Sequence, residues 1–458
     1  MNIAVRPEAW RPTLLRHRAS GLLALAMAAA MTSAQAMTLT QAYEAARAHD
    51  PTAAVSDAQY AADREAGVIE RANVRPNLGL QASGAYAATK SVGVFGQAQD
   101  QYGTWSATAQ LRQPLFRLDW FAVGDRADAL DSQAELTLRN ARLDLQSRVA
   151  QRYFNVLIAQ AALDQAEAEA QAVTQSLDDT RKRYEVELVP GTDLKEAIAR
   201  QDLSQALRVT ARRNLENARD ELEETTGDGQ AGLPMLPGDV SFPALQPATA
   251  EEWVAAARAS SPRIASARIQ AEIARTRAES TRAQAYPTLD LVGTAGRDDN
   301  SRFSFGSRND DARIGVELNM PIYGGGAILA GLRQADAQQR AAQAEFERTQ
   351  LQIERETRQL FRAVETAYLQ NRAYERSVSS ADTALAATRN GYDAGTRTIT
   401  DVLDAQSRLV QARRDLATTR YNLLLYLLQL KQIVGRLSER DFAEIDTMLT
   451  MQPDAAAR

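Results

Sequence analysis

The stretch Arg75-Pro-Asn-Leu-Gly-Leu80 recurs as Tyr286-Pro-Thr-Leu-Asp-Leu291, and this repeated transition decides the fold. In both copies a proline follows a segment rich in Ala and Arg, and a proline disfavours helix in the residue before it. After each proline, apolar and polar residues alternate, which is the period of a β-strand. The sequence therefore predicts, twice, a helix that ends at a proline and passes directly into a strand.

Further matches surround this transition and keep its order. Three more pairs of segments match at separations of 207 to 211 residues: 39–51 with 250–262, 113–116 with 320–323, and 180–184 with 388–392. Segments that match in order at nearly constant spacing indicate an internal repeat. At roughly 210 residues the repeat is too long for a solenoid, so it predicts two equivalent subdomains.

Each subdomain has the same expected order of elements. Residues 1–36 precede the first repeat, 37–226, which has a helix over 39–74, a strand hairpin over 77–116, a long helix over 120–187 and a return helix over 192–226. The second repeat, 249–436, has a helix over 250–285, a strand hairpin over 288–322, a long helix over 326–394 and a return helix over 398–436. Polar tips are expected over 88–102 and 296–311. Residues 227–248 read as a linker rich in Pro and Gly, and 437–458 as a weakly patterned C-terminal tail.

The two long helices are the most unusual part of this plan. Residues 120–187 contain no Pro and only one Gly. At 1.5 Å per residue, such a helix reaches on the order of 100 Å, far beyond an ordinary globular core. Most of its apolar positions are Ala, which allows close packing but buries little area per residue. We therefore expect these helices to pack against many neighbours, including other copies of the chain.

The N-terminus has the pattern of an export signal. Several Arg precede the short apolar run 21–30, and Ala34-Gln35-Ala36 fits a small-residue cleavage site, so residues 1–36 are predicted to be a signal peptide. The remainder has no second apolar run long enough for a membrane helix. An exported chain of this kind either stays free or enters a membrane as a closed β-barrel. Membrane barrels have at least about eight strands, so two or three chains would have to share one.

Aromatic residues gather around the predicted strands, as in the girdles of membrane barrels. They are Tyr86, Phe95, Tyr102, Trp105, Phe116, Trp120, Phe303, Phe305 and Tyr323. The alternative is a periplasmic α+β protein that uses these rings as its core.

Composition argues against several other classes of protein. The chain has no Cys and two His, which leaves no thiolate zinc site, cysteine nucleophile or His-rich metal site. Its net charge of −5 gives no sign of nucleic-acid binding. Gly324-Gly-Gly326 lacks the Lys-Ser/Thr of a phosphate loop, and no carboxylate pair stands out. We therefore expect no enzyme, no cofactor, no metal site and no nucleic-acid partner.

Three motifs carry a resemblance to a known family. They are Gly391-Tyr-Asp-Ala-Gly-Thr-Arg-Thr-Ile-Thr-Asp-Val-Leu-Asp-Ala405, Ala150-Gln-Arg-Tyr-Phe-Asn-Val-Leu157 and Leu318-Asn-Met-Pro-Ile-Tyr-Gly-Gly-Gly326. Together with the repeat and the long helices, they make nearly all of the chain after residue 36 similar to the TolC family of outer-membrane efflux and type I secretion channels. The absence of Cys excludes the lipoprotein branch of that family.

The resemblance implies an α+β membrane protein. The family fold is a homotrimer with a 12-stranded outer-membrane β-barrel, four strands from each chain, continued by a long periplasmic α-helical barrel of coiled-coil hairpins. The implied location is the outer membrane, in contact with its lipid, with an extension into the periplasm.

The resemblance also implies a function. Such a protein is the passive exit duct of a tripartite export system, serving type I protein secretion, drug efflux or both. A periplasmic adaptor protein joins it to an inner-membrane ABC or proton-driven pump, and by analogy the adaptor contacts residues 188–192 and 394–398. The alternative is a non-channel periplasmic coiled-coil spacer, or a trimeric stalk or adhesin.

Asp401 and Asp404 are candidate pore residues. They lie three residues apart, on one face of the expected helix. In a trimer their carboxylates would surround one axis and attract cations. The resemblance makes them the carboxylate ring of the periplasmic pore entrance. The residues alone favour helix capping, because Thr398-x-x-Asp401 is close to a capping box. Both roles can hold together.

Four more residues match the family's gate-latching network: Thr192, Asp193, Tyr392 and Arg397. The resemblance implies that Tyr392 bonds Asp193 within one chain. Arg397 then reaches Thr192 and Asp193 of the next chain, and a charge-assisted bond of this kind is stronger than a neutral one. Pro190-Gly191, next to Thr192, departs from the family pattern.

Overall fold

The computed structural model describes residues 36–93, 96–229, 232–238, 240–300 and 307–450. Outside these ranges lie the predicted signal peptide except for Ala36, the aromatic residues Phe95, Phe303 and Phe305, and the last part of the tail.

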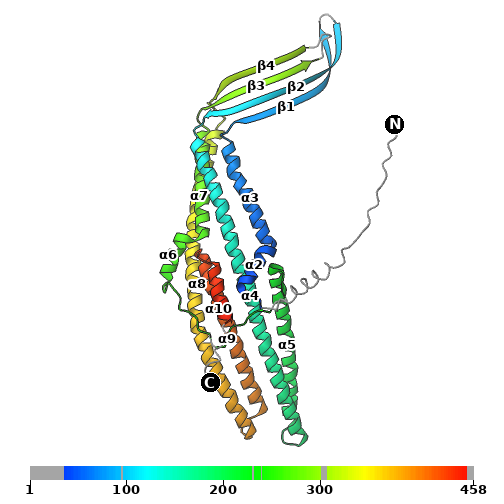
Figure 1. The fold of residues 1–458 in the computed structure, drawn as a ribbon, viewed down its shortest axis with the longest axis vertical. Helices are drawn as coiled ribbons and strands as arrows, with labels where there is room; N and C mark the ends of the chain where they lie inside the picture. The colour runs from blue at the N-terminus through cyan, green and yellow to red at the C-terminus, as the bar shows by residue number, and fades with distance from the viewer. Residues whose placement is uncertain (1–35, 94–95, 230–231, 239, 301–306, 451–458) are drawn as a thin grey trace, which may run out of the picture.

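The described residues form an elongated molecule with a sheet at one end and two helical hairpins at the other (Figure 1). The first repeat contains α2 (Leu39–His49), α3 (Pro51–Ala72), β1 (Asn77–Gly93), β2 (Gly96–Phe116), α4 (Trp120–Glu185) and α5 (Gly191–Thr226). The second contains α6 (Ala250–Ser260), α7 (Pro262–Ala283), β3 (Thr288–Asn300), β4 (Ser307–Asn319), α8 (Ala327–Asp393) and α9 (Ile399–Ile433). The chain continues into α10 (Glu439–Thr450).

The helix expected over 39–74 is two helices. Asp50, with φ −65° and ψ 117°, ends α2 and also caps α3, and Pro51 occupies the first turn of α3. Proline fits a first helical turn but not a helix interior, so the chain must restart there. The same break occurs at Ser261 and Pro262 in the second repeat.

The strands run further than the polar tips suggested. β1 and β2 stay paired from Asn77↔Arg112 to Gly93↔Gly96, and β3 pairs with β4 from Thr288↔Asn319 to Asn300↔Ser307. Strand pairing uses backbone groups, so polar side chains on both faces do not end it. The tips are therefore shorter than the expected segments 88–102 and 296–311.

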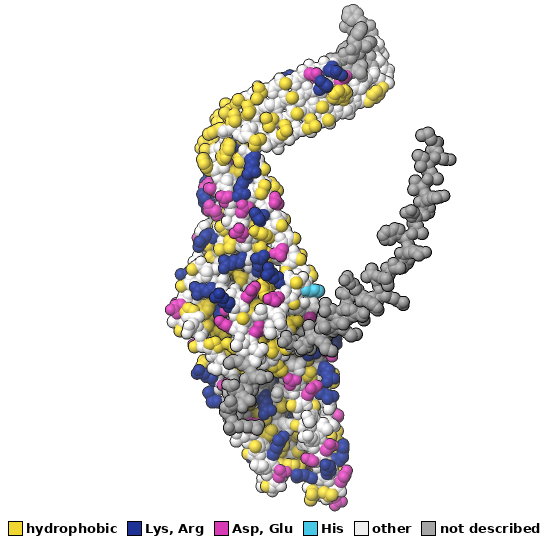
Figure 2. Space-filling view, in the orientation of Figure 1, with side chains coloured by type: hydrophobic (Ala, Val, Ile, Leu, Met, Phe, Trp, Pro, Cys, Tyr) yellow, Lys and Arg dark blue, Asp and Glu magenta, His cyan; other side chains and the backbone are white. Residues whose placement is uncertain are grey.

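The four strands make one antiparallel sheet in the order β1-β2-β3-β4, so β2 and β3 join the two repeats. The register places apolar residues on one face, among them Leu78, Leu80, Trp105, Leu111, Leu291, Ile314 and Val316. The other face carries polar residues, among them Asn77, Gln81, Ser106, Thr108, Arg112, Thr294 and Glu317. The apolar face is open: Leu80 is 78% exposed, and hydrophobic side chains spread over the sheet in Figure 2.

The rings at the base of the sheet are also exposed. Phe116, Trp120 and Tyr323 all lie at the surface, as do Leu115 and Ile322. The alternative in which these rings form a soluble core is therefore wrong.

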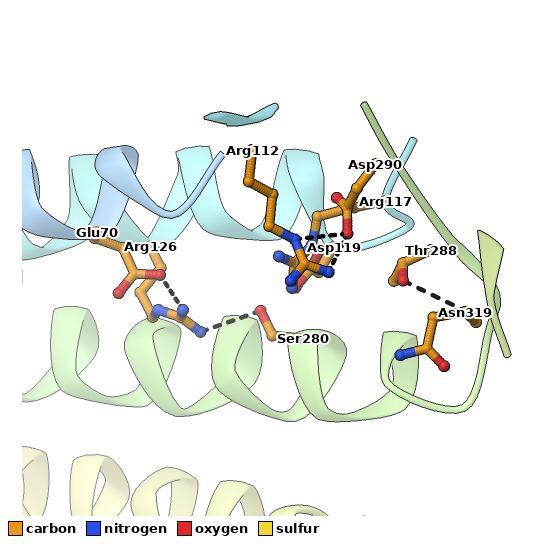
Figure 3. Close-up of polar contacts among 9 residues, drawn as sticks. All are labelled: Glu70, Arg112, Arg117, Asp119, Arg126, Ser280, Thr288, Asp290 and Asn319. Carbon is orange, nitrogen blue, oxygen red and sulfur yellow. Dashed lines mark hydrogen bonds and ion pairs between the residues drawn. The ribbon is translucent and has the colours of Figure 1, made fainter. Parts of the chain in front are cut away.

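Polar contacts bind the two repeats together where the sheet meets the helices (Figure 3). Arg126 of α4 pairs with Glu70 of α3 and donates to Ser280 Oγ of α7 at 3.1 Å. Nearer the strands, to the right in the figure, the Arg112 guanidinium on β2 lies 2.7 Å from the buried Asp290 carboxylate on β3. Polar contacts thus join adjacent helices and adjacent strands on either side of the junction.

The helices form a layer that continues the sheet. Below the strands they pack in the order α3, α4, α7, α8, which is the order of the strands that they precede or follow. Toward the hairpin end the order becomes α5, α4, α9, α8. Within the described ranges no helix is both long enough and apolar enough to cross a membrane.

The core lies at the waist, where short elements cover the long helices. Tyr153, Phe154 and Leu157 of α4 are completely or almost completely buried against α2, α9 and α10. Each such side chain contributes about 1.5–3 kcal/mol by burial. The linker belongs to this core, because Leu236 and Phe242 pack against it and the Tyr421 hydroxyl accepts from Leu236 N–H at 3.2 Å.

The C-terminal tail contains an ordered helix, α10, which the weak pattern of 437–458 did not predict. Phe442 packs edge-on against Tyr43 of α2, with ring centroids 5.7 Å apart. The Asp446 carboxylate accepts from the backbone N–H groups of Leu39 and Thr40 at 2.7 and 3.0 Å. An acid at a helix N-terminus satisfies free N–H groups and favours the helix dipole. α10 therefore caps α2.

Candidate functional site

The two hairpin turns lie side by side at the end of the molecule farthest from the sheet (Figure 1). The first turn joins α4 to α5 and the second joins α8 to α9. Both close in the same way: Leu188 N–H donates to Arg183 C=O, and Thr396 N–H donates to Gly391 C=O, each at 2.8 Å. The predicted site residues all lie at these turns: Tyr392 is in the last turn of α8, Arg397 is in the second turn, and the others are in the first two turns of α5 or α9.

Asp401 caps the start of α9. Its carboxylate accepts from the Thr398 N–H and hydroxyl at 2.9 Å, while the Asp401 N–H donates to Thr398 Oγ1 at 3.2 Å. These bonds from Thr398, helped by the nearby Arg397 and Arg408, lower the pKa of Asp401, so the group is negative at neutral pH. The capping box that the sequence suggested is formed.

Asp404 lies one turn further along α9. Its carboxylate forms an ion pair with Arg200 of α5 and is still 46% exposed. Arg200 was not among the predicted site residues. The one signal for Arg200 in the sequence is its spacing: Arg200 follows Glu196 by four residues, as Arg408 follows Asp404 in the second repeat.

The four latch residues do not all meet in one chain. Thr192 Oγ1 lies 3.4 Å from Asp193 Oδ1, so these two neighbours contact each other. The Tyr392 hydroxyl is buried and has no hydrogen-bond partner among the described residues, so a bond to Asp193 is not formed. Arg397 is exposed and folds over Gly391, where an added Cβ would lie 2.8 Å from Arg397 Cγ.

Arg183 takes the place beside Tyr392. Its guanidinium carbon lies 4.6 Å from the centre of the Tyr392 ring, and its Nη2 lies 3.2 Å from Asp393 Oδ1. A cation over an aromatic face and an ion pair thus tie the end of α4 to the end of α8. Arg183 lies in the repeated segment 180–184, but the sequence predicted no role for it.

Carboxylates are numerous at this end but do not gather as metal ligands. Within the described residues, no group of three or more His, Asp or Glu side chains could hold a metal ion. The side chains at this end interact through charge and hydrogen bonding.

Comparison with known proteins identifies the family. The family model described as outer membrane efflux protein matches residues 42–228 and 253–436, which are the two repeats. The chain belongs to this family. The resemblance to the TolC family is therefore confirmed, and membership decides for a channel against a spacer or stalk.

Individual relatives agree with this assignment. Outer membrane protein TolC of Vibrio cholerae is 32% identical over 87% of this chain and 91% of the relative. The proteases secretion protein PrtF of Dickeya chrysanthemi is 27% identical over 87% and 89%. The crystal structure of outer membrane protein VceC from Vibrio cholerae, 21% identical, superposes with a TM-score of 0.74 over 87% of this chain and 96% of that one.

The efflux channel is thus an outer-membrane protein that extends into the periplasm. Its fold class is confirmed: each chain supplies a four-stranded sheet to a barrel and long helices to a helical barrel. The open apolar face of the sheet is the face suited to lipid, and the hairpin turns lie at the periplasmic end.

Proposed function

We propose that three copies of this chain close into one duct, which is the passive exit of a tripartite export system for type I protein secretion, drug efflux or both. The observation that carries the proposal is the arrangement of free edges. β1 and β4 are the sheet edges, α3 and α5 lie along one side of the helical layer, and α8 lies along the other. Unpaired strand edges favour further pairing, and twelve strands suffice for a membrane barrel where four do not.

Exposed apolar side chains along these edges support the closure. On one side lie Ile69 of α3 and Leu203 and Val209 of α5, and on the other lie Leu351 and Leu369 of α8. Each is more than half exposed in the single chain. Patches of this kind on opposite edges fit a head-to-tail interface, which closes into a ring.

The partners follow from this role. The trimer would receive its cargo from an inner-membrane ABC or proton-driven pump, through a periplasmic adaptor that contacts residues 188–192 and 394–398. Transport through such a duct needs no chemical step, so no catalytic residue or cofactor is assigned.

Asp401 and Asp404 form the entrance ring in this proposal. Both carboxylates lie within the first two turns of α9, next to the periplasmic tip. The test is conductance in planar bilayers, with Asp401→Ala and Asp404→Ala introduced together. The wild type should give a small cation-selective current, and the variant should lose the selectivity. A channel whose selectivity is unaltered in the variant would leave these residues with capping alone, and a folded trimer without a channel would contradict the duct.

The latch is proposed for Thr192, Asp193, Tyr392 and Arg397. The buried Tyr392 hydroxyl lacks a hydrogen-bond partner among the described residues, and a buried hydroxyl left unpaired costs about 1–3 kcal/mol. That cost supports a bond that forms in the closed assembly. Replacing Tyr392 with Phe and Arg397 with Ser should raise single-channel conductance. Equal conductance of variant and wild type would refute the latch but not the fold.

A further inference from the structure

The Arg200–Asp404 pair connects the two repeats at the periplasmic end. Arg200 lies nine residues into α5 and Asp404 five residues into α9. These helices barely touch each other, because both pack against α4. The Arg200–Asp404 ion pair therefore links two helices that otherwise share few contacts.

The partner choice of Arg200 is specific. α5 and α9 begin with the same charge pattern, an acid, a second acid three residues on and an Arg four residues later: Asp193, Glu196 and Arg200 in α5, and Asp401, Asp404 and Arg408 in α9. An acid and an Arg four residues apart can pair along one helix. Among the described residues neither helix forms that pair, and Arg200 turns to Asp404 instead.

The charge of Arg200 also acts on a second carboxylate. Burial raises the pKa of Glu169 on α4, and the positive charges of Arg200 and Arg414 partly offset that rise. Arg200 thus pairs with the acid on α9 and also favours the charged form of an acid on α4.

We propose that Arg200 is the counter-charge of Asp404 and thereby sets the ion selectivity of the periplasmic entrance. The inference rests on the proposed function, in which Asp401 and Asp404 face the entrance. An ion pair in contact has little net charge at a distance, and exposed charges are screened beyond about 8 Å at physiological salt. Each chain then presents the single negative charge of Asp401, and Asp404 becomes available only when the pair opens.

The charge count makes a prediction for each of four forms of the chain, and two of the forms are expected to match. The net charge of Asp401, Asp404 and Arg200 together is −1 in the wild type and −2 in Arg200→Gln. It is −1 in Arg200→Gln with Asp404→Asn, and 0 in Asp404→Asn alone. Reversal potentials in a KCl gradient across a planar bilayer should follow this order. Arg200→Gln should be more cation-selective than the wild type, and Mg²⁺ should block it at a several-fold lower concentration.

Two further variants separate charge from structure. Arg208 lies eight residues later on α5 and has no ion pair among the described residues, so Arg208→Gln should match the wild type. Arg200→Lys keeps the charge and should also match it. Trimer migration on unboiled gels establishes that each variant is assembled.

The outcomes separate this inference from the proposed function. A wild-type channel whose selectivity is unchanged in Arg200→Gln, or changed equally in Arg208→Gln, overturns the role of Arg200 and leaves the duct intact. Failure of the Asp404→Asn substitution to restore Arg200→Gln overturns the pairing. A folded wild-type trimer that conducts no ions contradicts the proposed function itself.

Discussion

At the scale of single residues, the two turns differ at one strained position. Glu187 has φ 59°, and the equivalent residue of the second repeat, 208 positions later, is Gly395 with φ 74°. A left-handed conformation costs an L-residue about 1–2 kcal/mol, but a glycine adopts it without this cost. The first turn therefore holds strain that the second avoids.

Replacing Glu187 with Gly should stabilise the protein by about 0.5–1 kcal/mol, because relief of the strain exceeds the added flexibility of the unfolded chain. Gly395→Ala is the matched reverse change and should destabilise it by a similar or larger amount. Thermal unfolding of the purified protein in detergent measures both. A lower Tm for Glu187→Gly would show that the Glu187 side chain makes a compensating contact.

Asp401 gives a prediction about pH. Its pKa lies below the ordinary value of an aspartate, because Thr398 donates to the carboxylate in the folded state. A lowered carboxyl pKa adds stability above the unfolded value, and this stability is lost as the pH falls through the folded value. The Tm difference between wild type and Asp401→Asn should therefore shrink on acidification below about pH 4. A constant difference from pH 7 to pH 3 would contradict this.

At the scale of elements, ion pairs between helices fix how the helices of each repeat pack together. The starts of α3 and α7 are each held by an ion pair at the equivalent position, but the acidic and basic partners are exchanged between the two repeats. Arg148 of α4 pairs with Asp50 before α3, and Glu356 of α8 pairs with Arg263 at the start of α7. Arg148 and Glu356 are 208 positions apart. Both repeats thus hold equivalent helices together with an ion pair at the same position. Because the acid and the base are exchanged, a comparison of residue types between the repeats would not find this pair.

Arg183 is the corresponding tie at the periplasmic end. Arg183→Gln should weaken the contact between α4 and α8 by about 1 kcal/mol, because it removes a partly exposed ion pair and a cation–π contact. Hydrogen exchange of residues 394–398 should then accelerate about fivefold. Arg181→Gln is the control, since in the described part of the chain Arg181 pairs only with Asp178 of its own helix. Equal rates of hydrogen exchange in the two variants would show that Arg183 does not hold α4 and α8 together.

At the scale of the whole molecule, the sheet is the part that contacts the membrane. One of its faces requires apolar side chains, and the other tolerates polar and charged ones. Leu80→Arg should reduce the amount of trimer in the outer membrane, because Arg on a lipid face costs about 2–4 kcal/mol near the bilayer midplane. Gln81→Arg, on the neighbouring residue and the polar face, should assemble normally. Heat-modifiable migration on unboiled gels measures both. Equal loss in the two variants would contradict the assignment of the faces.

The sequence by itself determined the repeat, the order of the elements and the length of the long helices. These depend on residues that are neighbours in the chain: the proline after each helix, the period of two beyond it, and the long stretches without Pro. Helix α4 begins at Trp120 and ends at Glu185, against an expectation of 120–187. The family resemblance, carried by short motifs, pointed to the right class of channel.

Only the tertiary structure decided what depends on packing between distant segments. Arg200 and Asp404 are 204 positions apart in the sequence. Phe442, near the C-terminal end, packs against Tyr43, near the N-terminal end. The pattern of α10 is too short to predict a helix alone, and its burial against α2 supplies the missing stability. Tyr392 likewise lies beside Arg183, rather than Asp193, because α4 and α8 end together. Such pairings follow from the arrangement of the helices, which local patterns do not contain.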